Sequence, residues 1–270
     1  ANAPDLSASD DSGDSASDNL TNVSTMALST TGLTAGDFGL LYRIGATTTL
    51  VDSLIVPAGG SLTFSVINSE DNTFSFYSVV QDTAGNRSAS SANTNITIDQ
   101  TAPDVTGVTI DLNIASDTGI KNDDNLTNDN TPRFDVAGVT ISDSVFLYFN
   151  GTDSIGLKAA SASVGFTGSL STDNTYVVTM KSKDRAGNLS ATSSSMSFRL
   201  DTTPFTPTSA PALLAGTPLD PSQPEFDTGF SDSDNITNSR VPQFVASALP
   251  SISDSMHLYV QSGITNELVF

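Results

Sequence analysis

Aspartates recur in this chain at a fixed spacing, within a segment that appears three times. Each copy combines an Asp-Ser/Thr-Gly triplet with a downstream Asp-Asn-Leu/Ile-Thr-Asn sequence. The triplets occupy residues 11–13, 117–119 and 227–229, and the longer sequences occupy 18–22, 124–128 and 234–238. A repeat of about 100 residues in which the acidic residues recur at the same places is typical of an array of like domains, each with its own cation site.

Cation binding by oxygen atoms is the chemistry that these segments could perform. The windows 5–22, 111–128 and 220–238 hold 14 of the 30 acidic residues and one base, Lys121. Carboxylates crowded in this way repel one another unless a cation lies among them. The chain has no cysteine and one histidine, so the available ligands are oxygens, which suit Ca²⁺ better than zinc or copper. The spacing is neither that of an EF-hand nor that of the glycine-rich nonapeptide repeat.

The overall composition excludes several classes of protein. The chain of 270 residues has a net charge of −20, which disfavours nucleic acid and insertion into an anionic membrane. A hydrophobic content of 37% is enough for modest cores, so the acidity does not indicate disorder. The absence of cysteine excludes a disulfide scaffold, and the sequence has no apolar run of membrane-spanning length. The first residues already resemble the region between repeats, so we expect a piece of a longer protein.

Strand signals dominate the sequence between the acidic segments. The runs 74–80, 145–149 and 176–180 are rich in β-branched and aromatic residues, and glycine, asparagine, aspartate and proline separate them. This alternation of short strands with turn residues predicts an all-β sandwich.

Two further repeated elements close each full unit. An Asp-x-Ala-Gly-Asn-x-Ser sequence at 82–88 recurs at 184–190. We expect a tight turn in which Asp caps the turn while Gly and Asn supply positive φ angles. An Asp-x-Thr-x-Pro type of ending follows near 99–103 and recurs at 201–204, where proline ends the strand pairing.

These elements predict three domains: a sandwich over 1–102, a second over 103–206 and an incomplete third over 207–270. The third unit has the acidic segment and a strand at 256–260 but neither closing element. A sandwich that lacks its last strands leaves an edge open. We therefore expect the chain to continue, or another chain to complete the third unit by strand addition.

With these motifs the chain resembles the bacterial immunoglobulin-like repeats of giant calcium-dependent surface adhesins, including the RTX and biofilm-associated types. The resemblance rests on the acidic segment, the Asp-x-Ala-Gly-Asn turn and the Asp-x-Thr-x-Pro ending, and it covers nearly all of the chain. It implies tandem seven-stranded immunoglobulin-like sandwiches in an extended array, with calcium at the joints. It also implies an extracellular extender at the cell surface, serving cell adhesion or biofilm formation. Its partners would be neighbouring repeats of the same chain, with cell-surface glycans or proteins as further candidates.

The topology of a sandwich indicates where the ions would lie. The acidic segment, between the first two strands, lies at the pole where the last strand ends, and that pole faces the turn of the next domain. The expected first joint combines Asp11, Asp18 and Asp99 with Asp184 and Asn188. Counting the equivalent positions, the candidate calcium ligands are Asp5, Asp11, Asp18, Asn19, Asp99, Asp111, Asp117, Asp124, Asn125, Asp184, Asn188, Asp201, Asp220, Asp227 and Asp234.

Other interpretations compete with calcium-stiffened joints. Asp and Asn also cap ordinary solvated turns, and Asn19 and Asn125 begin Asn-x-Thr sequons that in some organisms carry sugars. The single histidine, His257, and the absence of cysteine give no nucleophile–base pair, so we predict no enzyme activity. A glycan- or protein-binding module is one alternative function, although the chain has no tryptophan and five tyrosines. A surface-layer or sheath subunit completed by strand addition is another.

Overall fold

The computed structural model describes residues 1–205, 211–213, 244–245, 258–262 and 265–269. The chain divides into two compact units, residues 1–202 and 203–270. Every regular element in the described part is a β-strand, and none of the described residues forms a helix that could cross a membrane. The expected all-β fold class is thus confirmed.

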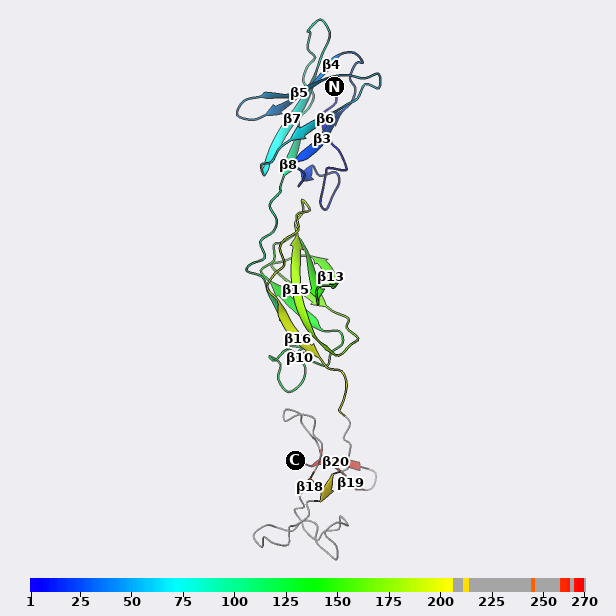
Figure 1. The fold of residues 1–270 in the computed structure, drawn as a ribbon, viewed down its shortest axis with the longest axis vertical. Coiled ribbons are helices and arrows are strands. Elements are labelled where there is room, and N and C mark those ends of the chain that lie inside the picture. Colours follow the sequence, from blue (N-terminus) through cyan, green and yellow to red (C-terminus); the bar gives the residue numbers. More distant parts are fainter. Residues whose placement is uncertain (206–210, 214–243, 246–257, 263–264, 270) are drawn as a thin grey trace, which may run out of the picture. The chain divides into compact units, whose positions relative to one another are not determined.

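Residues 1–102 form a first sandwich of two sheets (Figure 1). One sheet has the order β1-β3-β6 and the other has the order β2-β8-β7-β4-β5. The bounds of these strands are Asp5–Leu6 (β1), Leu20–Thr21 (β2), Thr25–Thr30 (β3), Phe38–Ile44 (β4), Thr49–Ile55 (β5), Leu62–Ile67 (β6), Asn72–Gln81 (β7) and Thr94–Ile98 (β8).

The second sandwich repeats this topology strand for strand, with one sheet ordered β14-β11-β9 and the other β10-β16-β15-β12-β13. Its strands are Thr109–Leu112 (β9), Leu126–Thr127 (β10), Arg133–Ala137 (β11), Ser144–Phe149 (β12), Asp153–Lys158 (β13), Ser163–Thr167 (β14), Asn174–Lys183 (β15) and Met196–Leu200 (β16). The strands predicted at 74–80, 145–149 and 176–180 are confirmed as parts of β7, β12 and β15.

Alternation of apolar and polar residues builds both cores. In β6 every second side chain is buried, so Leu62, Phe64 and Val66 face inward while their neighbours face water. Because side chains alternate across a strand, each sheet presents one apolar face to the other. In the second sandwich the Phe134 ring contacts the rings of Phe149 and Phe198, at centroid distances of 5.4 and 5.1 Å.

Each sandwich has one strand more than the seven that the family resemblance implied. The addition is the two-residue β2, which pairs in parallel with the last strand, β8, and its counterpart β10, which pairs in parallel with β16. These short strands are the ends of the acidic segments themselves. Pairing to the last strand fixes each acidic segment at the pole where that strand ends, as the topology predicted.

The unit of residues 203–270 contains two described strand pairs. Strand β17 (Ala212–Leu213) pairs with β18 (Phe244–Val245), and β19 (Leu258–Ser262) pairs with β20 (Thr265–Val269). Strand β19 contains residues 258–260 of the strand predicted at 256–260. The third acidic segment and His257 lie outside the described residues.

Candidate functional site

The first two acidic segments fold into the same loop, named here the first acidic loop (7–22) and the second acidic loop (113–128). Each begins with a turn in which two consecutive backbone N–H groups donate to one carbonyl. In the first loop Asp10 and Asp11 donate to Ser7, at 2.8 and 2.9 Å. In the second loop the corresponding residues donate to Asn113, at 2.7 and 2.9 Å. Identical local bonding explains why the two segments share their residue spacing.

A buried aspartate lies at the centre of each acidic loop. Asp11 and Asp117 are each 5% exposed. One carboxylate oxygen, Oδ2, accepts the backbone N–H of Asn19 or Asn125, in both loops at 3.1 Å. The other oxygen, Oδ1, is buried in both loops and has no hydrogen-bond partner among the described residues. A buried carboxylate oxygen without a partner costs free energy. The same unsatisfied acceptor therefore occurs in both loops.

The Asn-Leu-Thr sequence of each loop has structural reasons of its own. Asn19 and Asn125 have φ angles of 57° and 58°, a left-handed conformation that asparagine tolerates better than most residues. The buried hydroxyls of Thr21 and Thr127 donate to the carbonyls of residues 10 and 116. The same pattern that matches a glycosylation sequon therefore holds each loop closed.

Burial and a neighbouring charge both act on the first buried aspartate. Burial raises the pKa of Asp11, and the nearby Asp18 carboxylate raises it further, while the Asn19 N–H partly offsets both effects. The charged form of Asp11 is therefore disfavoured in the folded protein. A cation at this point would reverse that preference.

The predicted Asp-x-Ala-Gly-Asn turn lies between β15 and β16. The carboxylate of Asp184 accepts the backbone N–H groups of Gly187 and Asn188, both at 2.8 Å, so aspartate caps the turn as expected. Gly187 has a φ of 101°. The expectation that asparagine also takes a positive φ is wrong, because the Asn188 amide instead donates to Asp184 Oδ2 at 2.9 Å. Asn86 makes the same bond to Asp82 in the first sandwich.

The first acidic loop meets this turn, and we call the contact the first joint. Ser12 Oγ donates to the Ala186 carbonyl at 2.7 Å, and the Asp14 N–H donates to the Arg185 carbonyl at 3.1 Å. The Asn188 amide donates to the Asp99 carbonyl at 2.8 Å. The structure therefore brings the predicted loop, strand ending and turn together.

Glycine makes this close approach possible. A Cβ atom on Gly13 would lie 2.0 Å from the Arg185 carbonyl oxygen, and a Cβ on Gly187 would lie 3.1 Å from the Gly13 Cα. Gly13 also has a φ of 90°, which glycine adopts without steric cost. The invariant glycine of the triplet thus serves both the loop conformation and the contact with the next sandwich.

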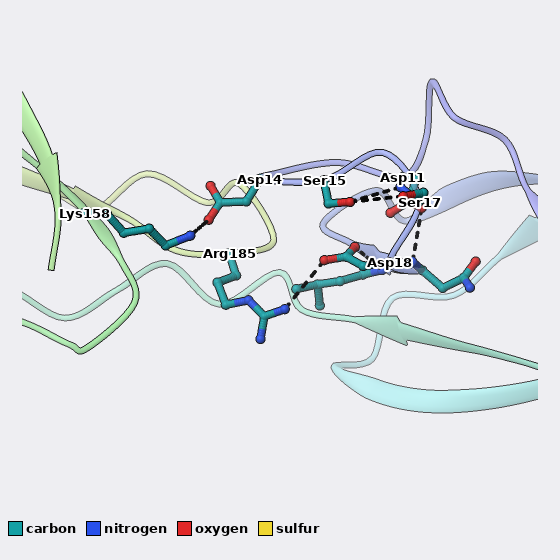
Figure 2. Close-up of polar contacts among 9 residues, drawn as sticks. Asp11, Asp14, Ser15, Ser17, Asp18, Lys158 and Arg185 are labelled. Atoms are coloured by element: carbon teal, nitrogen blue, oxygen red, sulfur yellow. Dashed lines mark hydrogen bonds and ion pairs between the residues drawn. The ribbon is translucent and has the colours of Figure 1, made fainter. Parts of the chain in front are cut away.

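Two ion pairs cross the first joint, and sequence reasoning missed both. Lys158 Nζ, at the end of β13, pairs with Asp14, and Arg185 pairs with Asp18 at 3.6 Å (Figure 2). The partners come from different sandwiches, and 144 residues separate Lys158 from Asp14. A comparison of loop sequences alone contains no signal for pairs at this distance.

A further carboxylate, Asp143, lies at the same pole of the second sandwich, immediately before β12. The residue is 5% exposed, and its Oδ2 accepts the Ser182 hydroxyl at 3.1 Å. Burial raises the pKa of Asp143, and the carboxylates of Asp184, Asp14 and Asp99 raise it as well. Acids from both sandwiches therefore act on one another across the joint.

The sequence does hold a signal for Asp143. The sequence Ile141-Ser142-Asp143-Ser144 leads into β12, and the same four residue types recur at 252–255 of the third unit. In the first sandwich Asp37 occupies the equivalent place, because its carbonyl accepts the Val56 N–H just as the Asp143 carbonyl accepts that of Ala159. An alignment of the three units on these acids would have added this position to the candidate ligands.

Of the remaining predicted ligands, Asp18 lies beside Asp11 at the first joint, and the others within the described residues each have different neighbours. Asp5 and Asp111 are exposed on β1 and β9, opposite Ser29 and Asp135. The carboxylates of Asp18 and Asp124 accept the N–H groups of residues 20 and 126. Asp201 pairs with Arg199 at 3.1 Å. Asp220, Asp227 and Asp234 lie outside the described residues.

The donor set suits a hard cation only in part. Each acidic loop offers one buried carboxylate oxygen without a partner, which a cation or a water molecule would satisfy. However, no three acidic, histidine or cysteine side chains within the described part of the chain converge as a preformed metal site. Calcium also accepts backbone carbonyl and amide oxygens, so carboxylates need not supply the whole set.

Comparison with known families decides the relationship of the chain. The model of the bacterial Ig-like domain family matches residues 1–100 and 104–202. The chain belongs to this family. Among curated proteins, none matches the chain.

Several solved structures are similar to the chain at low sequence identity and low TM-score. A biofilm-associated protein BSP domain is 17% identical, with a TM-score of 0.25, over 68% of this chain and 29% of that one. The fibronectin(III)-like modules of Clostridium thermocellum CbhA are 12% identical, with a TM-score of 0.37, over 67% and 87%. The human OSCAR ligand-binding domain is 13% identical, with a TM-score of 0.32, over 73% and 99%. The chain thus spans less than a third of the length of the biofilm-associated structure.

Proposed function

We propose that this chain is a structural extender segment of a larger bacterial cell-surface protein, an adhesin, in which calcium stiffens the joints between immunoglobulin-like domains. Two tandem matches to one bacterial family support a repeated structural module. Direct contacts across the first joint support a fixed arrangement there. The acids that gather at the joint support a role for a cation.

One observation carries the proposal. Asp11 and Asp117 each bury a carboxylate oxygen that has no hydrogen-bond partner among the described residues, in two loops where the other oxygen accepts the equivalent backbone N–H. A bound cation would complete both sites with the same chemistry. The alternative of a merely solvated turn does not account for carboxylates that are 5% exposed.

The residues that would hold calcium fall into two groups. The first group lies within the first acidic loop and consists of Asp11 and Asp18. Burial raises the pKa of Asp11, and the nearby Asp18 carboxylate raises it further. At the pole of the second sandwich, Asp99 and Asp184 have the same effect on Asp143. Calcium would supply the positive charge that makes all of these carboxylates favourable in their ionised form.

The expected energy is modest for each ion. With millimolar external Ca²⁺ and a dissociation constant of roughly 10⁻⁴ M, one ion adds about 1.4 kcal/mol to the stability of the folded state. At a joint the same energy restricts hinge motion, which is the default between tandem domains. The benefit to an extender would therefore be stiffness as much as stability.

Small-angle scattering of the whole chain, with Ca²⁺ and with EDTA, tests the stiffening. We expect a larger maximum dimension and a narrower pair-distance distribution with calcium, because the joints then hold a fixed angle. Unchanged scattering on chelation would reject the stiffening mechanism. Magnesium serves as a control cation, since it demands a smaller and more regular oxygen shell.

Calorimetric titration tests the proposed ligands. Asp11→Asn and Asp117→Asn should each remove or weaken one class of calcium site, whereas Asp5→Asn, on the exposed face of β1, should leave binding unchanged. Heats that are the same in all three variants would show that calcium binds elsewhere. Absence of binding at millimolar calcium would overturn the proposal as a whole.

The cellular context belongs to the same proposal. An extender at the cell surface meets millimolar calcium, and immunoglobulin-like repeats serve there as structural or adhesive modules. Such modules do not require catalytic residues, which agrees with the prediction of no enzyme activity. Adhesion itself would then depend on other parts of the full-length protein.

A further inference from the structure

We propose that Lys158 and Arg185 make the second sandwich selective for the acidic loop of the first. Complementary charges, independently of calcium, would then determine that these two domains pair in this order. This inference concerns the joint of the proposed function, but it does not require that calcium bind. It identifies which neighbour each domain accepts, through contacts that the structure shows directly.

The two bases face two acids of the first acidic loop. Lys158 pairs with Asp14 and Arg185 pairs with Asp18 (Figure 2). The acidic side chains are partly shielded, with 24% and 28% of their surface exposed, while the bases are 55% and 58% exposed. The bond from the Ser12 hydroxyl to the Ala186 carbonyl and the bond from the Asp14 N–H to the Arg185 carbonyl hold the loop in register with the turn, so the charges meet in a fixed geometry.

The equivalent positions of the first sandwich carry different chemistry. Strand register aligns Lys158 with Ile55, because the residues that follow them donate to the equivalent carbonyls of Asp143 and Asp37. The repeated turn aligns Arg185 with Thr83. Ile55 is 64% exposed. The first sandwich therefore presents an apolar and a neutral residue where the second presents two bases.

The outward-facing residue of the acidic loop also differs between copies. The position after the triplet glycine is Asp14 in the first loop and Ile120 in the second, and Ile120 is 75% exposed. The third copy has Phe230 at this position. Only the first of the three loops carries an acid at this position. Complementary charges at one joint and apolar residues in the other loops indicate selective pairing rather than a universal connector.

Spin-label distance measurements on the whole chain test this proposal. The chain has no cysteine, so labels attached at Ser65→Cys and Ser197→Cys, both exposed on strands of different sandwiches, report the geometry of the first joint. The comparison is made in EDTA, where calcium contributes nothing. Wild type should give a narrow distance distribution in low salt, and the distribution should broaden at about 1 M salt, where the screening length falls to about 3 Å.

The central variants replace Lys158 and Arg185 of the second sandwich with the residue types that the first sandwich has at the equivalent positions. Lys158→Ile with Arg185→Thr should lower the ratio of closed to open joint by about two- to fivefold for each pair lost, the range for exposed ion pairs. The single reversal Lys158→Asp should broaden the distribution as well. The double reversal Asp14→Lys with Lys158→Asp should restore it, because a pair of opposite sign then forms again.

The outcomes separate this proposal from the calcium proposal. A narrow distribution in EDTA for all variants overturns the charge-selective joint and leaves calcium stiffening untouched. Broadening by the reversal without rescue by the double reversal also overturns it, because the effect would then be structural. Broadening and rescue in EDTA, with no further change on addition of calcium, support the charge-selective joint and reject calcium stiffening at this joint.

Discussion

The two acidic loops are alike inside and different outside. Inside, both bury an aspartate with one satisfied and one unsatisfied oxygen, both place asparagine at positive φ, and both close through a buried threonine hydroxyl. Outside, the first loop presents Asp14 to a lysine, whereas the second presents the exposed Ile120. The interior residues are thus fixed by the loop conformation, and the outer residue is free to follow whichever domain lies next.

One interior position shows how the same shape survives substitution. In the first loop Asp10 Oδ2 accepts the Ala27 N–H directly, at 2.7 Å. In the second loop Ser116 takes this place: its Oγ accepts the Arg133 N–H at 3.0 Å and donates to Asp129 at 2.8 Å. The carboxylate has moved to a second residue while the backbone bond is retained. What the loop conserves is the acceptor at that point.

The largest expected effect comes from adding a methyl group at the triplet glycine. Gly13→Ala would place Cβ 2.0 Å from the Arg185 carbonyl, so the first joint should open and the label distances should broaden in calcium and in EDTA. Gly119→Ala is the matched control. It has the same positive-φ penalty of about 1–2 kcal/mol but meets no atom of the described residues within 4 Å. Equal broadening of the first joint in both variants would contradict the comparison.

The next effect tests the shared interior. Thr21→Val and Thr127→Val preserve side-chain shape but remove the hydroxyl. The carbonyl of residue 10 or 116 then loses its donor, and the N–H of residue 23 or 129 loses its acceptor. Each change should lower the free energy of unfolding of its own domain by about 1–3 kcal/mol, as measured by urea denaturation. Similar losses are expected because Thr21 and Thr127 are 0% and 1% exposed. A loss in only one domain would show that the loops are not equivalent.

The effect of the Asp143→Asn substitution on the thermal midpoint should have opposite signs in EDTA and in calcium. The pKa of Asp143 is raised by burial and by neighbouring acids, so its charged form opposes folding when no cation is present. In EDTA, Asp143→Asn should therefore raise the thermal midpoint at pH 7. In calcium the same variant should lower it, because a ligand is lost. A shift of the same sign in both conditions would remove Asp143 from the calcium site.

The pH dependence of this position follows from linkage. A carboxyl group with a raised folded-state pKa gains stability as the pH falls from 7 through that pKa, and the gain is complete below the unfolded value of about 3.9. In EDTA the stability difference between Asp143→Asn and wild type should therefore shrink as the pH is lowered over this window. Melting curves at about pH 7, 6, 5 and 4 would measure this difference across the window. A difference that stays constant would contradict the assigned protonation.

The smallest expected effect concerns the strand endings, where the two domains use the same clamp. Asp71 accepts the N–H of Gln100 at 2.7 Å and the hydroxyl of Thr101. In the second sandwich Asp173 accepts both groups of Thr202, at 2.8 and 2.6 Å. Asp71→Asn and Asp173→Asn should each speed hydrogen exchange at residue 100 or 202 alone.

Protonation should act on the first clamp in the same direction as the substitution. Hydrogen bonds from Thr101 and Gln100 lower the pKa of Asp71, so its contribution is present above the unfolded value of about 3.9 and is lost as the pH falls through the lower folded value. Hydrogen exchange at Gln100, relative to that of an unstructured amide at the same pH, should therefore rise only in acid below this range. If the wild-type Gln100 N–H already exchanged at neutral pH as fast as an unstructured amide, the clamp would not be formed.

Local chemistry is what the sequence could predict. The strands at 74–80, 145–149 and 176–180 and the aspartate-capped turn depend on patterns within about 20 residues, and all are confirmed. The placement of the acidic segments beside the last strands followed instead from the topology of a sandwich, and it is also confirmed. The error over Asn188 arose at the same scale, because asparagine can either adopt a positive φ or donate its amide to a nearby carboxylate. Residue type alone does not choose between the two.

The sequence by itself therefore determined the repeated all-β units and the closed acidic loops, because these form from neighbouring residues whose types limit the backbone. Only the tertiary structure decided what the loops contact. The Lys158–Asp14 and Arg185–Asp18 pairs and the acids around Asp143 unite side chains from two sandwiches. Their positions depend on the packing of whole sheets, and that packing is set by the cores and not by the charged residues that it brings together.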